Sequence, residues 1–277
     1  MQYVGKYMDT FEAAMQMLFL QKGYGKITHL DAMGRRCFAF CHGTDGYGWY
    51  LPVVGAERAV HDIAIQMKLE NRLTAGRFPA MERLREEGGI VYGPVARAAV
   101  LQRPDIMYYH GENRFFYISR EEGDVYAVTD PSGFPGVLCT EAELEEFFRV
   151  ENGITVSLCE NDGLQGQGAD LKQIWSLGVA FHREMTGNAE NSTLKKESLD
   201  AYVHLSSSRI ALWYGVINFI QQTEKVFRLR TQVGGSGGSD RKLRELQSGM
   251  LKAVEEEKVY LLPETEQAIW KEIMDEI

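Results

Sequence analysis

Three polar side chains are of types, and at positions, that suit catalysis or ligand binding: Thr10, Arg114 and Asp130. Thr10 follows Asp9 at the expected start of a helix, next to the positive end of the helix dipole. Arg114 opens an aromatic, strand-like run, and Asp130 closes the next such run directly before Pro131. Because proline cannot continue a strand ladder, Asp130 is expected at a turn, where its carboxylate can orient a partner on the neighbouring strand.

Arg114 and Asp130 are expected to form a partly buried ion pair rather than an acid–base pair. Arginine stays protonated at ordinary pH and cannot accept a proton, but its guanidinium could clamp a carboxylate or a phosphate. A threonine hydroxyl gains little from a helix dipole, because its pKa is far higher than that of a cysteine thiol. The simplest role for Asp9 and Thr10 is therefore a helix cap.

The elements that must position these side chains are a helix and a hairpin. Residues 114–119 and 124–129 are rich in aromatic and β-branched residues and are separated by a turn-forming segment, which predicts two paired strands. Apolar residues at helical spacing predict an amphipathic helix from Asp9 to Lys22, with Glu12 in a capping position and Gly23 as the stop.

The rest of the first half alternates between the two kinds of element. Helices are expected at residues 57–73, 78–87 and 140–148, and strands at residues 37–42, 49–54, 88–95 and 154–158. In the strand at 37–42, Cys37 and Cys41 would share one face. Cys41 and His42 are adjacent, so they would point to opposite faces and are more simply buried strand residues than a catalytic pair.

The second half has no strand pattern. Helices are expected at residues 169–185, 195–230, 241–257 and 264–277, the first with Ile174, Leu177, Phe181 and Met185 on its apolar face. A polar, glycine-rich stretch at 160–168 separates a first domain, 1–160, from an all-helical domain, 169–277. Residues 234–239, GGSGGS, have the composition of a flexible or engineered linker.

Composition excludes several classes of protein. A net charge of −9 over 277 residues argues against nonspecific nucleic-acid binding and against an anionic membrane surface. Four cysteines do not make a disulfide framework, and no cluster has the spacing of a metal site. The first residues do not have the pattern of a signal peptide, no run is long enough to span a membrane, and no cofactor motif is found. A cytoplasmic protein is expected.

The order of these motifs resembles the papain-like superfamily. It is similar to the double-glycine leader peptidases and to the butirosin-biosynthesis-type acyltransferases. In those relatives Gly-x-x-His and apolar residues lead through a turn to Asp-Pro, and here Gly111-Glu112-Asn113-Arg114 leads to Asp130-Pro131. The helix carrying Thr10, a Gly-Pro-Val segment at 93–95 and an appended helical half also follow the family's order. The resemblance covers about half of the chain, and it implies an α+β fold with an N-terminal helix packed on an antiparallel sheet.

Carried over residue by residue, the resemblance places Thr10 at the nucleophile, Arg114 at the base and Asp130 at the residue that orients the base. Two of these three positions have changed, and no glutamine precedes Thr10 at the spacing of a papain-like oxyanion hole. If a cysteine at position 10 had been replaced deliberately by threonine, the presence of Arg114 at the position of the base would still be unexplained. Asp9, His110 and Asn113 lie beside these positions and are candidate binding residues.

Three functions follow from the resemblance. The first is a non-catalytic relative in natural-product biosynthesis that binds an acyl, peptidyl or carrier-linked group, with a carrier protein or an active paralogue as partner. The second is an active acyl- or aminoacyl-transferase with a rearranged site, using His110 or His42 as its base. The third is a cysteine peptidase, which the changed residues favour least. Whether the chain is an enzyme is left open between the first two.

Overall fold

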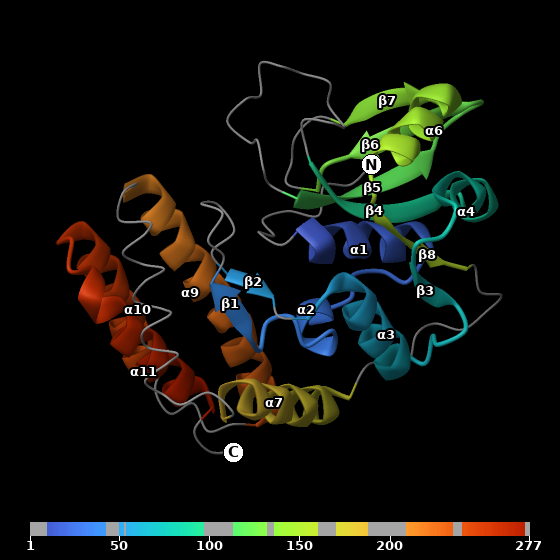
Figure 1. The fold of residues 1–277 in the computed structure, drawn as a ribbon. Coiled ribbons are helices and arrows are strands. Elements are labelled where there is room, and N and C mark those ends of the chain that lie inside the picture. Colours follow the sequence, from blue (N-terminus) through green and yellow to red (C-terminus); the bar gives the residue numbers. More distant parts are fainter. Residues whose placement is uncertain are drawn as a thin grey trace. The chain divides into compact units, whose positions relative to one another are not determined.

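The computed structural model shows two compact units (Figure 1). One consists of Met1–Leu30 with Ala56–Ala169, and the other of Asp31–Gly55 with Asp170–Ile277. The division expected from sequence placed all of residues 31–55 in the first domain, whereas this segment groups with the helices in the structure. The structure describes residues 10–42, 50–52, 54–96, 113–131, 136–159, 170–187, 209–234 and 240–274.

A six-stranded antiparallel sheet forms the centre of the first unit, so the chain is a mixed α+β protein as expected. The strands lie in the order β3-β8-β4-β5-β6-β7. Their bounds are β3 Leu73–Gly76, β4 Gly89–Ala96, β5 Asn113–Arg120, β6 Val125–Thr129, β7 Val137–Thr140 and β8 Ile154–Leu158. The last strand in sequence therefore lies inside the sheet, between β3 and β4.

The predicted hairpin is confirmed in β5 and β6. Its register pairs Tyr117 with Thr129 and Arg120 with Tyr126, and the N–H of Glu121 closes the turn on the carbonyl of Val125 at 2.8 Å. Phe116, Ile118, Tyr126 and Val128 from the two strands are buried in one apolar cluster. The alternation of aromatic and β-branched residues thus provides the core of the unit.

Helices cover the two faces of this sheet. On one face α1, Thr10–Gln21, contacts β4 and β5, and the rings of Phe11 and Phe115 meet edge to face at 5.1 Å. On the other face α4, Ala80–Glu87, and α6, Glu141–Val150, contribute Leu84 and Leu144 to the apolar cluster. The acidic helix expected after residue 140 is confirmed as α6, which begins with a capping box between Thr140 and Glu143.

The amphipathic character expected for the first helix is wrong. Every residue from Thr10 to Phe19 is buried, including Glu12 and Gln16. Gln16 is accommodated by hydrogen bonds to main-chain atoms of Gly25 and Ile27. A helix buried all round needs no polar face, so its periodicity could not show which side meets the sheet.

The helix expected at 57–73 is shorter than predicted. It is α3, Ala56–Met67, and Lys68 ends it in a left-handed conformation, with φ of 57°. The N–H of Leu69 reaches back to the carbonyl of Ala64 at 2.7 Å, as in a Schellman motif. Leu73, the last residue of the expected helix, instead begins β3, and the rest of that strand was not predicted.

In the residues that the structure describes, the second unit contains four long helices and a small hairpin. The helices are α7 Leu171–Gly187, α9 Arg209–Val233, α10 Asp240–Glu255 and α11 Leu262–Met274, and a short helical turn, η2 Val259–Leu261, precedes α11. β1, Phe40–His42, pairs with β2, Tyr50–Pro52, and a one-turn helix, α2 Leu30–Met33, precedes them. The strand expected at 37–42 begins only at Phe40, so Cys37 and Cys41 do not share a strand.

The apolar face predicted for the helix at 169–185 is displaced around α7. Ile174 is buried as expected, but Leu177 and Met185 are exposed by 42% and 38%. Trp175, Gly178 and His182 are buried instead, with Gly178 against the ring of Phe38. Contact with the segment around Phe38, which is remote in sequence, decided which face is covered.

Candidate functional site

Thr10 ties the start of α1 to the main chain of β5. It is the first residue of the helix and is 8% exposed. Its Oγ accepts a hydrogen bond from the backbone N–H of Phe115 at 3.0 Å. The residue that the resemblance assigns to the nucleophile therefore contacts the residue that follows Arg114 in the chain.

β4 is irregular on the other side of β5 from this N–H. Tyr92 pairs with Phe116 and Val95 pairs with Arg114, so two residues, Gly93 and Pro94, stand where a regular ladder has one. Proline has no N–H, and Gly93 lies so close to β5 that an added Cβ would be 2.5 Å from the carbonyl oxygen of Arg114. Because the carbonyl of Arg114 faces β4, the N–H of Phe115 points the other way across the trans peptide, and Thr10 accepts from it beyond Thr129, where β6 ends.

Arg114 and Asp130 form the ion pair that the sequence predicts. Nη1 of Arg114 lies 4.0 Å from Oδ1 of Asp130, and the two side chains are 14% and 1% exposed. This separation is longer than a hydrogen bond, so the contact between these two atoms is Coulombic. Burial keeps water away from the carboxylate and weakens the screening of its charge.

The strand register places this ion pair on the sheet face opposite α1. Cross-strand partners share a face, and Val95, the partner of Arg114, belongs to the apolar cluster under α4 and α6. Phe115 contacts Phe11 of α1 and so points the other way. Thr10 thus approaches the main chain of β5 from the face that Arg114 points away from.

The remaining predicted site residues are placed only in part. Asn113 begins β5, but its side chain lies outside what the structure describes, as does that of His42 at the end of β1. Asp9 and His110 lie outside the described residues altogether. The structure therefore brings Arg114 and Asp130 together and sets Thr10 against the neighbouring main chain.

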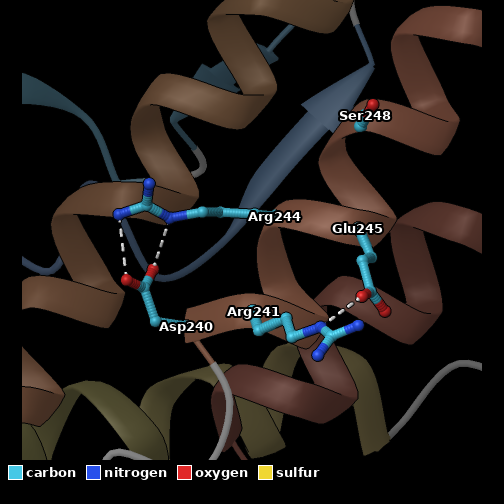
Figure 2. A pocket seen from close by; sticks show the side chains of 5 residues that line it. All are labelled: Asp240, Arg241, Arg244, Glu245 and Ser248. Atoms are coloured by element: carbon cyan, nitrogen blue, oxygen red, sulfur yellow. Dashed lines mark hydrogen bonds and ion pairs between the residues drawn. The ribbon is translucent and has the colours of Figure 1, made fainter.

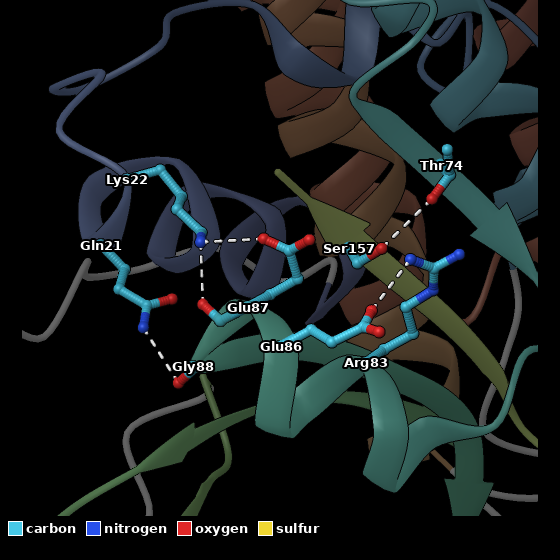
Figure 3. Close-up of polar contacts among 8 residues, drawn as sticks. All are labelled: Gln21, Lys22, Thr74, Arg83, Glu86, Glu87, Gly88 and Ser157. Atoms are coloured by element: carbon cyan, nitrogen blue, oxygen red, sulfur yellow. Dashed lines mark hydrogen bonds and ion pairs between the residues drawn. The ribbon is translucent and has the colours of Figure 1, made fainter. Parts of the chain in front are cut away.

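A second polar cluster in the same unit was not found from the sequence (Figure 3). Nζ of Lys22 donates to the carbonyl of Glu87 at 2.8 Å and to its Oε2 at 3.2 Å, and the two side chains are 2% and 10% exposed. Gln21 donates to the carbonyl of Gly88 at 3.0 Å. These contacts fasten the end of α1 to the end of α4. Because the partners are more than 60 residues apart, these contacts could not be predicted from a local sequence pattern.

Cys159 belongs to this second cluster but lacks the features of a nucleophile. Burial, a hydrogen bond to Glu87 and the negative charge of Glu87 raise the pKa of its thiol. Burial and the charge of Glu143 likewise raise the pKa of Cys139. Since the thiolate is the reactive form, both thiols are kept in their unreactive form at neutral pH.

A shallow hollow lies along α10 in the helical unit (Figure 2). Its lining residues come from this one helix, and their charges are paired along it. Arg244 binds both carboxylate oxygens of Asp240 at 2.9 Å, and Arg241 binds Glu245 at 2.9 Å. Exposed pairs four residues apart are ordinary helix-surface interactions, so this hollow carries no functional assignment.

Neither a metal site nor a membrane span is found in the part of the chain that the structure describes. No three His, Cys, Asp or Glu side chains there are grouped so that they could hold a metal ion. None of the helices there is both long enough and apolar enough to cross a bilayer.

Comparisons with known proteins add no assignment. Protein-family models, curated proteins and solved structures give no match to this chain. Function is therefore inferred from the geometry around Thr10, Arg114 and Asp130.

Proposed function

We propose that this protein is a non-catalytic relative of the papain-like acyltransferases that binds an acyl, peptidyl or carrier-linked group. In this proposal the first unit is a papain-like domain, with α1 packed on the sheet, and it has lost cysteine-type activity. The partner is a carrier protein or an active paralogue in a natural-product pathway.

One observation carries the proposal. The hydroxyl of Thr10 holds the main chain of β5, while Arg114 is paired with buried Asp130 on the opposite sheet face. Acyl transfer by a side-chain nucleophile needs a base within hydrogen-bond reach of it. Arg114 cannot be that base because its guanidinium remains protonated.

The thiols of Cys139 and Cys159 agree with this proposal. The pKa values of Cys139 and Cys159 are raised, the reverse of what an activated nucleophile requires. Cys37 is buried, at 0% exposure. A rearranged active site would need His110 or His42 as its base, and the side chains of both lie outside what the structure describes.

The proposal predicts that the protein does not catalyse acyl transfer, so removing the Thr10 hydroxyl should leave its function intact. Release of thiol from acyl N-acetylcysteamine thioesters, followed with a thiol-reactive dye, should run at the background rate in both the wild type and Thr10→Ala. A wild-type rate well above background, lost about 100-fold or more in Thr10→Ala and kept in Thr10→Ser, would show an active transferase instead.

The same position should matter for stability. Thr10→Val keeps the shape of the side chain but removes the acceptor of the Phe115 N–H. Leaving a buried N–H without its acceptor should lower the free energy of unfolding by about 1–3 kcal/mol. Thr10→Ser retains the acceptor and should cost less. Urea denaturation of the two variants measures the difference, and equal losses would contradict the structural role.

A further inference from the structure

We propose that the outer edge of β7 binds an extended, basic segment of a partner polypeptide, which adds to the sheet as a further antiparallel strand. β7 is an end strand of the six-stranded sheet, and among the residues that the structure describes it pairs only with β6 (Figure 1). An end strand offers main-chain N–H and C=O groups to a chain that can reach them. This inference goes beyond the proposed function and does not depend on it.

The register of β7 shows which of its main-chain groups face outward. In an antiparallel ladder, pairs that exchange hydrogen bonds alternate with pairs that do not. Val125 lies opposite Thr140, but its carbonyl accepts from the N–H of Glu121 at 2.8 Å. The N–H of Thr140 donates to the side chain of Glu143 at 2.7 Å. This pair is therefore one without ladder bonds, and so is the pair that contains Leu138, two residues along. The N–H and C=O of Leu138 consequently point away from β6.

The side chains of β7 leave its edge open to another strand. Leu138 is 70% exposed, whereas Cys139 on the other face packs against the apolar cluster. Charged residues and proline on an end strand discourage pairing with other chains, and Val137–Thr140 contains neither. β3, at the other end of the sheet, has Arg72 and Arg77 directly beside it in the chain. Flanking cations thus disfavour a basic strand at β3 but not at β7.

The charges around this edge select a basic partner. Exposed Glu122 and Asp124 lie in the turn before β6, whose first residue pairs with Thr140. Glu143 accepts from the N–H and hydroxyl of Thr140, and these hydrogen bonds lower its pKa and keep it charged at neutral pH. Arg120 lies 3.9 Å from Asp124 and balances one of these negative charges. A second copy of this chain, with its net charge of −9, would add to the excess rather than balance it.

The position of the acidic side chains sets the direction of the added strand. Each pair of neighbouring strands in this sheet is antiparallel. An antiparallel addition places the N-terminus of the partner segment beside Thr140, where the acidic side chains are. The basic residues of the segment should therefore precede its extended residues, and an apolar side chain should lie against Leu138.

Short synthetic peptides test the proposal. The probe, acetyl-KKVTVTV-amide, has two lysines before alternating valine and threonine, and its counterpart has two glutamates in place of the lysines. NMR titration of the full chain should show about tenfold or tighter preference for the basic peptide. The Leu138 amide should shift and the Thr74 amide of β3 should not. N-methylation of the valines removes the donors that an edge requires and should weaken binding about tenfold or more.

Variants assign the binding to this edge. Leu138→Pro removes the outward N–H without removing a ladder bond to β6, and it should weaken binding of the basic peptide about tenfold or more. Leu138→Lys places a cation on the edge and should have a similar effect. The matched control is Val150→Lys on α6, where Val150 is 65% exposed and lies outside the sheet. Binding to this control should stay within about twofold of the wild type. Circular dichroism checks that each variant is folded.

The opposite results would overturn the proposal. They are equal binding of the basic and acidic peptides, the absence of any peptide-induced shift in β7, or unchanged binding by folded Leu138→Lys. Analytical ultracentrifugation tests the other occupant. A dimer that Leu138→Lys dissociates and that the basic peptide does not compete with would assign the edge to a second copy of this chain instead.

Discussion

At the scale of single residues, Thr10 and His182 each hold a distant stretch of main chain through one side-chain hydrogen bond. Thr10 binds the N–H of Phe115, and Nδ1 of His182 lies 2.6 Å from the carbonyl of Phe38. A carbonyl accepts only, so Nδ1 of His182 must carry the proton. These bonds join residues 105 and 144 positions apart. No local pattern specifies them.

His182 gives the helical unit a predictable pH dependence. It is 8% exposed and packs against Trp270, with ring centroids 4.5 Å apart and ring planes tilted by 38°. Burial lowers its pKa, a shift opposed by the hydrogen bond to Phe38. Because the folded-state pKa lies below the unfolded value of about 6.5, the unfolded chain takes up the proton first as pH falls. The contribution to stability is complete above that value and declines below it.

Urea denaturation at pH 7.5, 6.5 and 5.5 measures this effect. The contribution of His182 to the slope should approach, at most, about 1.4 kcal/mol per pH unit below pH 6.5. His182→Gln retains an N–H donor but cannot titrate, so its stability should fall less over the same interval. Identical pH dependence in the two proteins would show that His182 does not contribute.

At the scale of elements, the irregularity of β4 positions the start of β5. Gly93 has φ of 154°, and an added Cβ would lie 2.5 Å from the Arg114 carbonyl oxygen and 2.9 Å from the Phe115 Cα. Main-chain atoms of a paired strand cannot move aside as a flexible side chain can. Adding a single methyl group at Gly93 would therefore force β4 and β5 apart.

Gly93→Ala should accordingly destabilise the sheet unit. We expect a loss of about 2–3 kcal/mol in the free energy of unfolding, as for an overpacked core, measured by urea denaturation. Hydrogen exchange should show reduced protection of the Phe115 amide. Gly55→Ala is the control, because a Cβ there meets nothing within 4 Å, and its change should stay within about 0.5 kcal/mol. Equal effects of the two substitutions would refute the steric explanation.

At the scale of the whole molecule, the chain folds as two units, and each unit is built from two segments that are separated in the sequence. The segment Asp31–Gly55 interrupts the sheet unit in sequence and belongs to the helical unit. Phe38 packs edge to face on Trp175, and Lys225 pairs with Asp31, so α7 and α9 both hold this segment. Because these contacts span more than 130 positions, a division of the chain at one linker could not include them.

The helical unit should tolerate a longer connection between α9 and α10. These helices end at Val233 and begin at Asp240, and they pack against each other. Lengthening the GGSGGS stretch at 234–239 from six to twelve residues should cost about 0.6 kcal/mol from loop closure and leave the helical circular dichroism unchanged. A loss above about 2 kcal/mol, measured by thermal or urea unfolding, would mean that the stretch makes specific contacts.

The sequence by itself determined the elements whose information is local. The β5–β6 hairpin follows from its aromatic and β-branched runs and its turn, and α6 follows from its acidic first turn. The proximity of Arg114 and Asp130 was also predicted, because both flank that hairpin. Each of these features depends on residues within about twenty positions of one another, where pattern and turn chemistry leave few alternatives.

Only the tertiary structure decided the features that depend on distant partners. It placed β8 inside the sheet, buried α1 on all sides and turned a different face of α7 inward. It also set Thr10 against the main chain of β5 while Arg114 points to the other sheet face. Side-chain periodicity reports that a face is buried but not which remote segment buries it. That choice arises from packing among residues that the chain brings together only on folding.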